Sequence, residues 1–142
     1  MGCAATPAEV LLRDTQLLDP ATITTLLKRA PVNAAEDVRV DTLLQSAEFS
    51  AHLLQVQTEY TRRLHRRHDL TILIHRGHGQ VYLNDRRYTA ALGDVFHIPR
   101  DTPYQILSHG PDPLAIIQIF TPPLVADDVI PIQPRARSYP RQ

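Results

Sequence analysis

Apolar and polar residues alternate with a period of two over the central part of this chain. In the segment 52–60, HLLQVQTEY, the alternation starts at Leu54, which is typical of a β-strand with one buried face. The segments LTILI (70–74) and LAIIQIF (114–120) are apolar at nearly every position, which indicates strands covered on both faces. From about Val38 onward the pattern therefore predicts one strand after another.

A short helix is predicted ahead of the strands, in the segment DPATITTLLKRAP. Asp19 suits the N-cap and Pro20 suits the first turn, where a missing N–H leaves no hydrogen bond unmade. Pro31 then ends the helix, because a proline ring cannot continue it. The apolar residues that fall on one face of this helix are Ile23, Leu26 and Leu27.

Turns separate the predicted strands, and QVYLNDRRYTA is expected to form a hairpin that turns at Asn84-Asp85, because both residues tolerate positive φ. Six to eight short strands with almost no helix indicate an all-β sandwich or closed barrel. A chain so rich in proline after the last strand is expected to lie on the surface. The expected regions are an N-terminal anchor, linker and short helix (1–37), a barrel (38–123) and a proline-rich C-terminal arm (124–142).

Composition limits the classes of partner. The 142 residues suit one domain. Lysine and arginine number 15, as do aspartate and glutamate, so the chain has no overall basic field that would hold nucleic acid. No stretch approaches the roughly 18 apolar residues that a membrane-spanning helix needs. A small-molecule ligand is the partner class that composition leaves open, and a membrane is expected only through a lipid anchor.

The start of the chain, MGCAATPAEV, contains the single cysteine, Cys3, so no disulfide forms within the chain. A Gly-Cys pair resembles the cleavage point of bacterial lipoproteins, with Met1 interpreted as an added initiator and Cys3 as the lipidated first residue. This predicts a periplasmic or outer-envelope location. The alternatives are myristoylation through Gly2 and Thr6, and an incidental exposed cysteine in a cytoplasmic protein.

Two motifs carry a resemblance to a known family. From Gly93 the sequence reads GDVFHIPRDTPYQILS, which resembles the second motif of the cupins. Gly93 and Pro99 match that motif. The motif's glycine, histidine and asparagine positions are occupied here by Asp101, Tyr104 and Ser108.

The upstream segment RLHRRHDLTILIHRG resembles the first cupin motif, His-x-His, a carboxylate and a glycine. Arg63 occupies the first histidine position, while His65 and Gly77 match the second histidine and the glycine. The carboxylate falls on Asp69 when counted forward from His65 and on Leu70 when counted back from Gly77. The chain is thus similar to small single-domain bacterial cupins over roughly residues 50–123.

The resemblance implies an all-β fold, the cupin double-stranded β-helix or jelly-roll barrel, with one short N-terminal helix. It also implies a metal site of three histidines and a glutamate that suits iron, copper, manganese, nickel or zinc. This chain keeps His65 and, by one count, Asp69. Arg63 cannot ligate, and Tyr104 ligates only as phenolate, so we expect a partly degenerate site.

The main functional hypothesis is a cupin that binds a small anionic ligand in the barrel lumen. Arg63 has the strand parity of His65 and is expected to share its face. A buried guanidinium must be paired, by Asp69, by Tyr104 or by an incoming anion. The predicted ligand-binding residues are therefore Arg63, His65 and Tyr104. The opposing interpretation is that Arg63 extends outward at the mouth and side chains fill the lumen.

The alternative is a metal-dependent enzyme, a dioxygenase or isomerase, with a rearranged metal site. Its candidate ligands are His65, His68, Asp69 and His97, with Tyr104 as an addition; the other interpretation of His97 is a buried structural histidine. A purely structural barrel and a homodimer paired through edge strands are also open. The histidines expected on solvated surface are His52, His75, His78 and His109.

Overall fold

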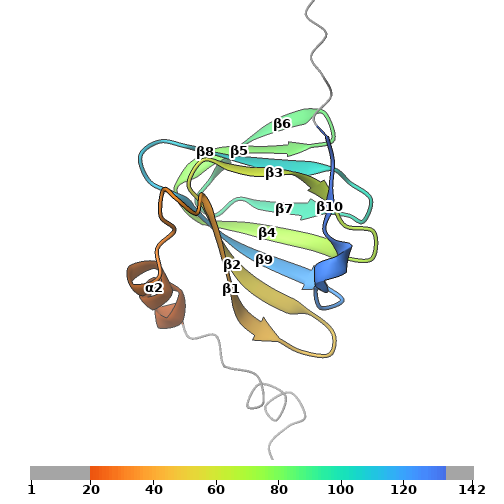
Figure 1. The fold of residues 1–142 in the computed structure, drawn as a ribbon, viewed down its shortest axis with the longest axis horizontal. Coiled ribbons are helices and arrows are strands. Elements are labelled where there is room, and N and C mark those ends of the chain that lie inside the picture. Colours follow the sequence, from red (N-terminus) through yellow and green to blue (C-terminus); the bar gives the residue numbers. More distant parts are fainter. Residues whose placement is uncertain (1–19, 134–142) are drawn as a thin grey trace, which may run out of the picture.

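The computed structural model describes residues 20–133, which form two antiparallel five-stranded sheets that face each other (Figure 1). Sheet A has the strand order β1-β2-β9-β4-β7, and sheet B has the order β10-β3-β8-β5-β6. The elements are α2 (Pro20–Arg29), β1 (Val38–Gln45), β2 (Ser50–Val56), β3 (Glu59–Leu64), β4 (Asp69–Arg76), β5 (His78–Leu83), β6 (Arg86–Ala91), β7 (Val95–Ile98), β8 (Tyr104–His109), β9 (Leu114–Thr121), the short 3-10 helix η1 (Ala126–Asp128) and β10 (Ile130–Pro131).

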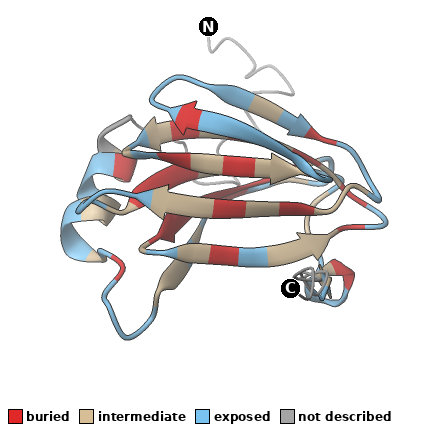
Figure 2. Ribbon diagram, turned by 90° about the horizontal axis from the view of Figure 1, so that it is seen from above, coloured by how far each residue is buried: buried red, intermediate tan, exposed pale blue. Residues whose placement is uncertain are grey.

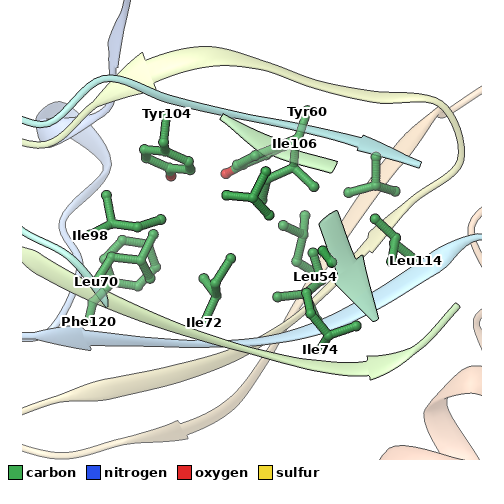
Figure 3. Packing of buried hydrophobic residues seen from close by; sticks show 14 residues of the cluster. Leu54, Tyr60, Leu70, Ile72, Ile74, Ile98, Tyr104, Ile106, Leu114 and Phe120 are labelled. Carbon is green, nitrogen blue, oxygen red and sulfur yellow. The ribbon is translucent and has the colours of Figure 1, made fainter. Parts of the chain in front are cut away.

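The inner faces of the two sheets form the core, and buried and exposed residues alternate along the strands (Figure 2). Ile72 and Ile74 on β4, and Ile116 on β9, are fully buried. Ile106 on β8 faces them from sheet B (Figure 3). The period-two pattern of the sequence thus places apolar side chains between the sheets, and the expected all-β barrel of the jelly-roll type is confirmed.

Helix α2 covers part of the outer face of sheet A, beside β1 and β2 (Figure 1). Ile23 packs there against Leu53 of β2. Gln55 of β2 fastens the chain after the helix: its side-chain oxygen accepts from the Val32 N–H at 3.1 Å, and its Nε2 donates to the Ala30 carbonyl at 2.9 Å. This helix explains why β2 is buried on both faces.

The segment after β9 does not leave the barrel. It forms η1 and then β10, whose residues Ile130 and Pro131 pair with Leu64 and Arg63 at the edge of sheet B. A proline in such a strand is tolerated at a sheet edge, where one N–H is not needed. The first part of the proline-rich arm therefore lies against the barrel and covers the β3 edge.

The predicted hairpin joins β5 to β6, and Asn84 adopts the expected positive φ, 54°. Within residues 20–133, no helix is long and apolar enough to cross a membrane. Cys3, with the rest of the expected anchor, lies outside the described residues.

Candidate functional site

The structure brings Arg63, His65 and Tyr104 together at one end of the barrel. The register between β3 and β8 shifts after Tyr60, so that Arg63 lies directly opposite Tyr104. Just beyond β3, the Nε2 of His65 lies 2.8 Å from the Tyr104 hydroxyl. The two sequence motifs therefore converge, and the residues that meet there are an arginine, a histidine and a tyrosine.

The direction of the His65–Tyr104 hydrogen bond follows from the other ring nitrogen. Nδ1 of His65 lies 2.9 Å from the Asp128 carbonyl, which only accepts, so Nδ1 carries the proton. Burial lowers the pKa of His65 and keeps the ring neutral. Nε2 therefore accepts from the Tyr104 hydroxyl. Burial also raises the pKa of Tyr104 well above 10.0, so this phenol stays protonated.

Arg63 stands at the rim of this pair. Its guanidinium carbon lies 3.6 Å from the centroid of the Tyr60 ring, a cation–π contact. Its Nε donates to the Thr61 carbonyl at 2.9 Å and its Nη2 to the Thr61 hydroxyl at 3.0 Å. Among residues 20–133, no carboxylate oxygen lies within 4.0 Å of the guanidinium, whose charge is therefore held in place without a counter-ion.

Asp69 is not the partner of Arg63. It accepts from the Arg100 backbone N–H at 3.0 Å and pairs with the Arg100 guanidinium at 3.4 Å. His97 lies on the outer face of β7, exposed, with its Nδ1 3.4 Å from the Thr71 hydroxyl. Asp69 and His97 therefore do not join His65 in a metal ligand set. His97 is also not the buried structural histidine that was the other expectation for this position.

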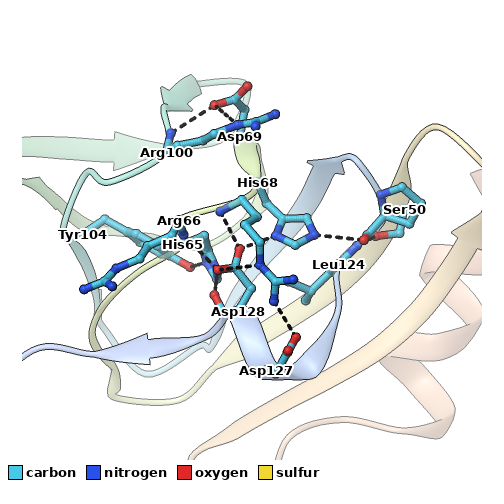
Figure 4. Close-up of polar contacts among 12 residues, drawn as sticks. Ser50, His65, Arg66, His68, Asp69, Arg100, Tyr104, Leu124, Asp127 and Asp128 are labelled. Atoms are coloured by element: carbon cyan, nitrogen blue, oxygen red, sulfur yellow. Dashed lines mark hydrogen bonds and ion pairs between the residues drawn. The ribbon is translucent and has the colours of Figure 1, made fainter.

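A carboxylate that sequence reasoning missed organises the polar cluster (Figure 4). Asp128 of η1 is only 2% exposed. Its oxygens accept from the backbone N–H groups of Arg66 and Arg67 at 3.0 and 2.9 Å, and from Nδ1 of His68. The other nitrogen of His68 lies 3.0 Å from the Pro123 carbonyl. Both nitrogens of His68 therefore face acceptors within the protein.

The charge of Asp128 is stabilised by these contacts. Burial by itself raises the pKa of this carboxyl group, but the hydrogen bonds from His68 and from the backbone of Arg67 and Arg66 outweigh it and lower the pKa to about 2. Asp128 lies 60 or more positions from its partners in the chain. The only signal in the sequence was an acidic pair inside a proline-rich arm.

His52 lies inside the barrel, so its expected position on solvated surface was wrong. It is 8% exposed, because β2 is flanked by β1 and β9 and its inner face is covered by sheet B. Its ring nitrogens lie 2.9 Å from the Ser50 hydroxyl and 3.3 Å from the Thr42 hydroxyl. Burial lowers the pKa of His52, so this ring is neutral at pH 7.

A continuous series of aromatic contacts links the two sheets at this end of the barrel. We call it the aromatic arc: Tyr60, Tyr104, His65, Phe120 and His52. Successive ring centroids are separated by 6.2, 5.6, 5.0 and 5.7 Å. The hydroxyls of Tyr60 and Tyr104 both point into the space between the sheets (Figure 3). Arg63 lies on the first ring of the arc, and His52 lies at its far end.

A separate cleft of about 250 Å³ lies on the outer side of sheet A, beside α2. Of its three polar lining residues, Gln55, Arg76 and Asp112, the first is engaged in hydrogen bonds to the chain after α2. None of the predicted site residues reaches this cleft. It is lined by Leu27, Pro31, Gln55, Arg76, Asp112, Pro113 and Ala115.

Comparison with known proteins agrees with this architecture. Residues 52–120 match the sequence model of the cupin domain. No curated protein sequence matches the chain. KdgF from Halomonas sp. is similar in structure, with 21% sequence identity, a TM-score of 0.60, and coverage of 68% of this chain and 89% of that one.

Two further solved structures show the same fold. TT1209 from Thermus thermophilus has 17% identity and a TM-score of 0.61, with 69% of this chain and 95% of that chain covered. Pac13, described as a unique nucleoside dehydratase, has 16% identity and a TM-score of 0.60, with 68% and 79% covered. A variant of Pac13, which comes from Streptomyces, was also solved with uridine. At these identities the likeness concerns the fold, which is the expected cupin barrel.

Proposed function

We propose that this chain, a small cupin by its fold, binds a small anionic molecule at the end of the barrel where Arg63, His65 and Tyr104 meet. The observation that carries the proposal is the guanidinium of Arg63. It has no carboxylate partner among residues 20–133, yet it is held by the Tyr60 ring and by Thr61. A fixed cation that has no carboxylate partner in the described part of the chain, beside a buried neutral pair, favours an anionic ligand.

The size of the attraction supports this choice. Two opposite unit charges about 4 Å apart gain about 4 kcal/mol at an effective dielectric constant of about 20. Arg63 is partly exposed, whereas Tyr104 and His65 are 1% and 3% exposed. We therefore place the ligand's charged group at Arg63 and its remainder toward the aromatic arc.

The binding is proposed to need no metal ion, and the cupin metal motif is proposed to be degenerate. Both nitrogens of His65 are engaged with Tyr104 and Asp128, and the buried phenol of Tyr104 stays protonated. Arg63 places a positive charge where a cation would lie. Within residues 20–133, no three side chains of histidine, cysteine, aspartate or glutamate are grouped to hold a metal ion. These side chains do not suit a divalent cation.

The test is a thermal-shift and calorimetric screen of the purified protein against acetate, butyrate, benzoate and phosphate, with uridine as an uncharged comparison. We expect at least one anion to stabilise the protein and uridine to have no effect. The Arg63→Met variant should lose this stabilisation. The control is Arg87→Met, which removes the same charge from an exposed position on β6. Equal anion binding by the parent and Arg63→Met would contradict the proposal.

We also propose attachment to the bacterial envelope through a lipid on Cys3, for which the Gly2-Cys3 pair is the supporting feature. The native protein, expressed from its full genomic reading frame, should partition into detergent, and its N-terminal peptide should carry a lipid mass on Cys3. The Cys3→Ser variant should remain in the aqueous phase. An unmodified N-terminus in a water-extracted native protein would rule the anchor out.

A further inference from the structure

The cleft beside α2 is lined by two charged side chains that the proposed function does not use, Arg76 and Asp112. Its floor follows from the register of sheet A. Ala115 of β9 lies directly opposite Gln55 of β2 on one side and Arg76 of β4 on the other. Neighbouring strands are about 4.8 Å apart, so the backbones at Gln55 and Arg76 are separated by about 10 Å. Because alanine is small, this row leaves a hollow between two longer side chains.

A bulge in β4 turns Arg76 toward this cleft. Ile74 lies opposite Ile116 and points into the core, and the register then shifts, so that Arg76 lies opposite Ala115. Without the extra residue His75, position 76 would have the strand parity of Ile74 and would face the core. Ala115 belongs to the apolar cluster that packs under α2, so Arg76 shares the outer face of sheet A.

Another wall of the cleft is the loop between β8 and β9, which carries Asp112 and Pro113. The turn between β4 and β5 packs against this loop. Gly77 has a φ of 79°, and a Cβ at this position would lie 2.9 Å from the Pro113 carbonyl oxygen. Glycine permits both this φ and this close approach. The backbone of Asp112 is therefore held beside the end of β4, next to Arg76.

Neither charged side chain has an ionic partner in the described part of the chain. Among residues 20–133, no carboxylate oxygen lies within 4.0 Å of the Arg76 guanidinium. In the same range, no nitrogen of a basic side chain lies within 4.0 Å of the Asp112 carboxylate. The two groups are therefore not paired with each other, although they line one cleft of about 250 Å³.

We propose that this cleft binds a small amino acid, a molecule with one carboxylate and one ammonium group on a short apolar chain. The carboxylate pairs with Arg76 and the ammonium group with Asp112. The chain lies against the apolar walls, which are Leu27, Pro31 and Pro113. The volume of about 250 Å³ is below the roughly 300–1,000 Å³ of sites for drug-sized ligands, which favours so small a molecule.

The two charges of the cleft select for a zwitterion. A simple carboxylate that pairs with Arg76 meets the like charge of Asp112, and a simple amine that pairs with Asp112 meets the like charge of Arg76. An amino acid offers each side chain an opposite charge and adds no net charge to the cleft. Charge-assisted hydrogen bonds to the guanidinium and to the carboxylate supply the affinity.

The test is an NMR titration of the isotope-labelled full chain with glycine, β-alanine, 4-aminobutyrate and 5-aminopentanoate. This series increases the separation between the two charged ends. The affinity is read from the backbone amide signals of Gly77 and Ala115. We expect at least one member to bind about tenfold more tightly than the carboxylic acid and the amine of the same length, each of which lacks one charged group.

Two variants each remove one charge from an exposed side chain of the cleft. Arg76→Met should bind the amino acid no more tightly than the matching amine, and Asp112→Asn no more tightly than the matching carboxylic acid. The controls are Arg87→Met and Asp127→Asn, which remove the same charges from exposed positions outside the cleft and should bind as the parent does. Equal binding of the amino acid by the parent and both cleft variants would overturn the inference.

The Arg63→Met variant separates this site from the one proposed at the end of the barrel. It should leave amino-acid binding at the cleft unchanged. If it abolishes the response to amino acids, or if no member of the series binds the parent more tightly than its two singly charged counterparts, the inference is wrong. Failure at the cleft leaves the proposed function intact, because the anion screen measures that function through Arg63.

Discussion

At the scale of single residues, Arg63 and Tyr104 align with histidines of the cupin motifs that this sequence resembles. The fold brings both of them beside His65. The fold therefore brings the two motif segments together, but the side chains that meet there differ from those of the cupin motifs. An arginine adds a permanent positive charge, and a buried phenol adds a group that stays protonated.

The first prediction concerns variants in which positions 63 and 104 carry the histidines of the cupin motifs. Arg63→His combined with Tyr104→His should raise the affinity for zinc or nickel well above that of the parent, because the double change supplies two imidazoles next to His65. Arg63→His alone should help more than Tyr104→His alone, since a divalent cation near a guanidinium meets a repulsion of several kcal/mol at an effective dielectric constant of about 20. Metal content after equilibration and dialysis measures this order.

A matched control in the same experiment is Tyr104→Phe. In our account it leaves the metal content of the parent unchanged, because Tyr104 is not a ligand. A parent that is purified with stoichiometric metal and loses it on this substitution would show that the degenerate-site account is wrong.

The second prediction concerns pH. Because burial depresses the pKa of His65 below its ordinary 6.5, unfolding lets this ring bind a proton that the folded protein resists. Its contribution to stability is complete above pH 6.5 and is lost as the pH falls toward its folded value. Urea midpoints measured from pH 7.5 to pH 5 should therefore decline, and less steeply in His65→Asn. Burial also lowers the pKa of His52, so His52 should contribute to the pH dependence that remains in His65→Asn.

Identical slopes for the parent and His65→Asn would show that His65 is as readily protonated in the folded protein as in the unfolded one. The matched control is His109→Asn, which makes the same replacement at an exposed histidine of β8.

At the scale of elements, the segment η1–β10 completes the barrel instead of trailing from it. β10 covers the edge of β3, and Asp128 fastens η1 to the turn between β3 and β4 through side-chain and backbone donors. The same residue's carbonyl holds Nδ1 of His65, so the segment also sets which nitrogen of that ring faces Tyr104.

The third prediction tests this attachment. Asp128→Asn should lower the free energy of unfolding at pH 7 by about 2 kcal/mol, the value that a pKa depressed from 3.8 to about 2 represents. The carboxylate's contribution is present above pH 3.8 and disappears as the pH falls toward about 2, so the difference between parent and variant should close over that range. Chemical denaturation at pH 7, 4 and 2.5 measures it.

The control for this prediction is the neighbouring Asp127, whose side chain is 76% exposed and pairs only with Arg67 among the described residues. Asp127→Asn should change stability little, because exposed ion pairs contribute little. Equal losses of unfolding free energy in the two variants would mean that the buried network around Asp128 stabilises the protein no more than the exposed ion pair of Asp127.

At the scale of the whole molecule, the outer face of sheet A beyond α2 bears an apolar row across three strands. Ile117 of β9 lies opposite Leu73 of β4, which lies opposite Val95 of β7. Val95 is 61% exposed and Ile119, on the same face of β9, is 37% exposed. Apolar side chains gathered on one sheet face favour association with another protein surface.

The fourth prediction is a homodimer through this face. Sedimentation of the parent at several concentrations should show a dimer, and Val95→Asp should be monomeric, because it buries an unpaired charge in the contact. Val125→Asp is the control, since Val125 is 44% exposed in the C-terminal segment. A parent that stays monomeric at high concentration would contradict the prediction.

Part of this protein was determined by the sequence alone. The period-two pattern predicts the strands, because successive side chains on a strand point to opposite faces. The turn residues predict the hairpin at Asn84, since its φ depends on local sterics. The resemblance of the two motifs to those of the cupins implied that His65 and Tyr104 belong to one site, and they meet at 2.8 Å although 39 positions separate them in the chain. The strands and the hairpin, by contrast, depend on the chemistry of residues close together in the chain.

Other features were decided only by the tertiary structure. Asp128 finds His68 across 60 positions, Asp69 finds Arg100 instead of Arg63, and His52 becomes buried by strands that its own segment does not contain. The burial of a side chain and the identity of its polar partner depend on which distant segment packs against it. No local pattern contains that information, because a buried charge or amide takes whichever partner the assembled fold places within hydrogen-bond distance.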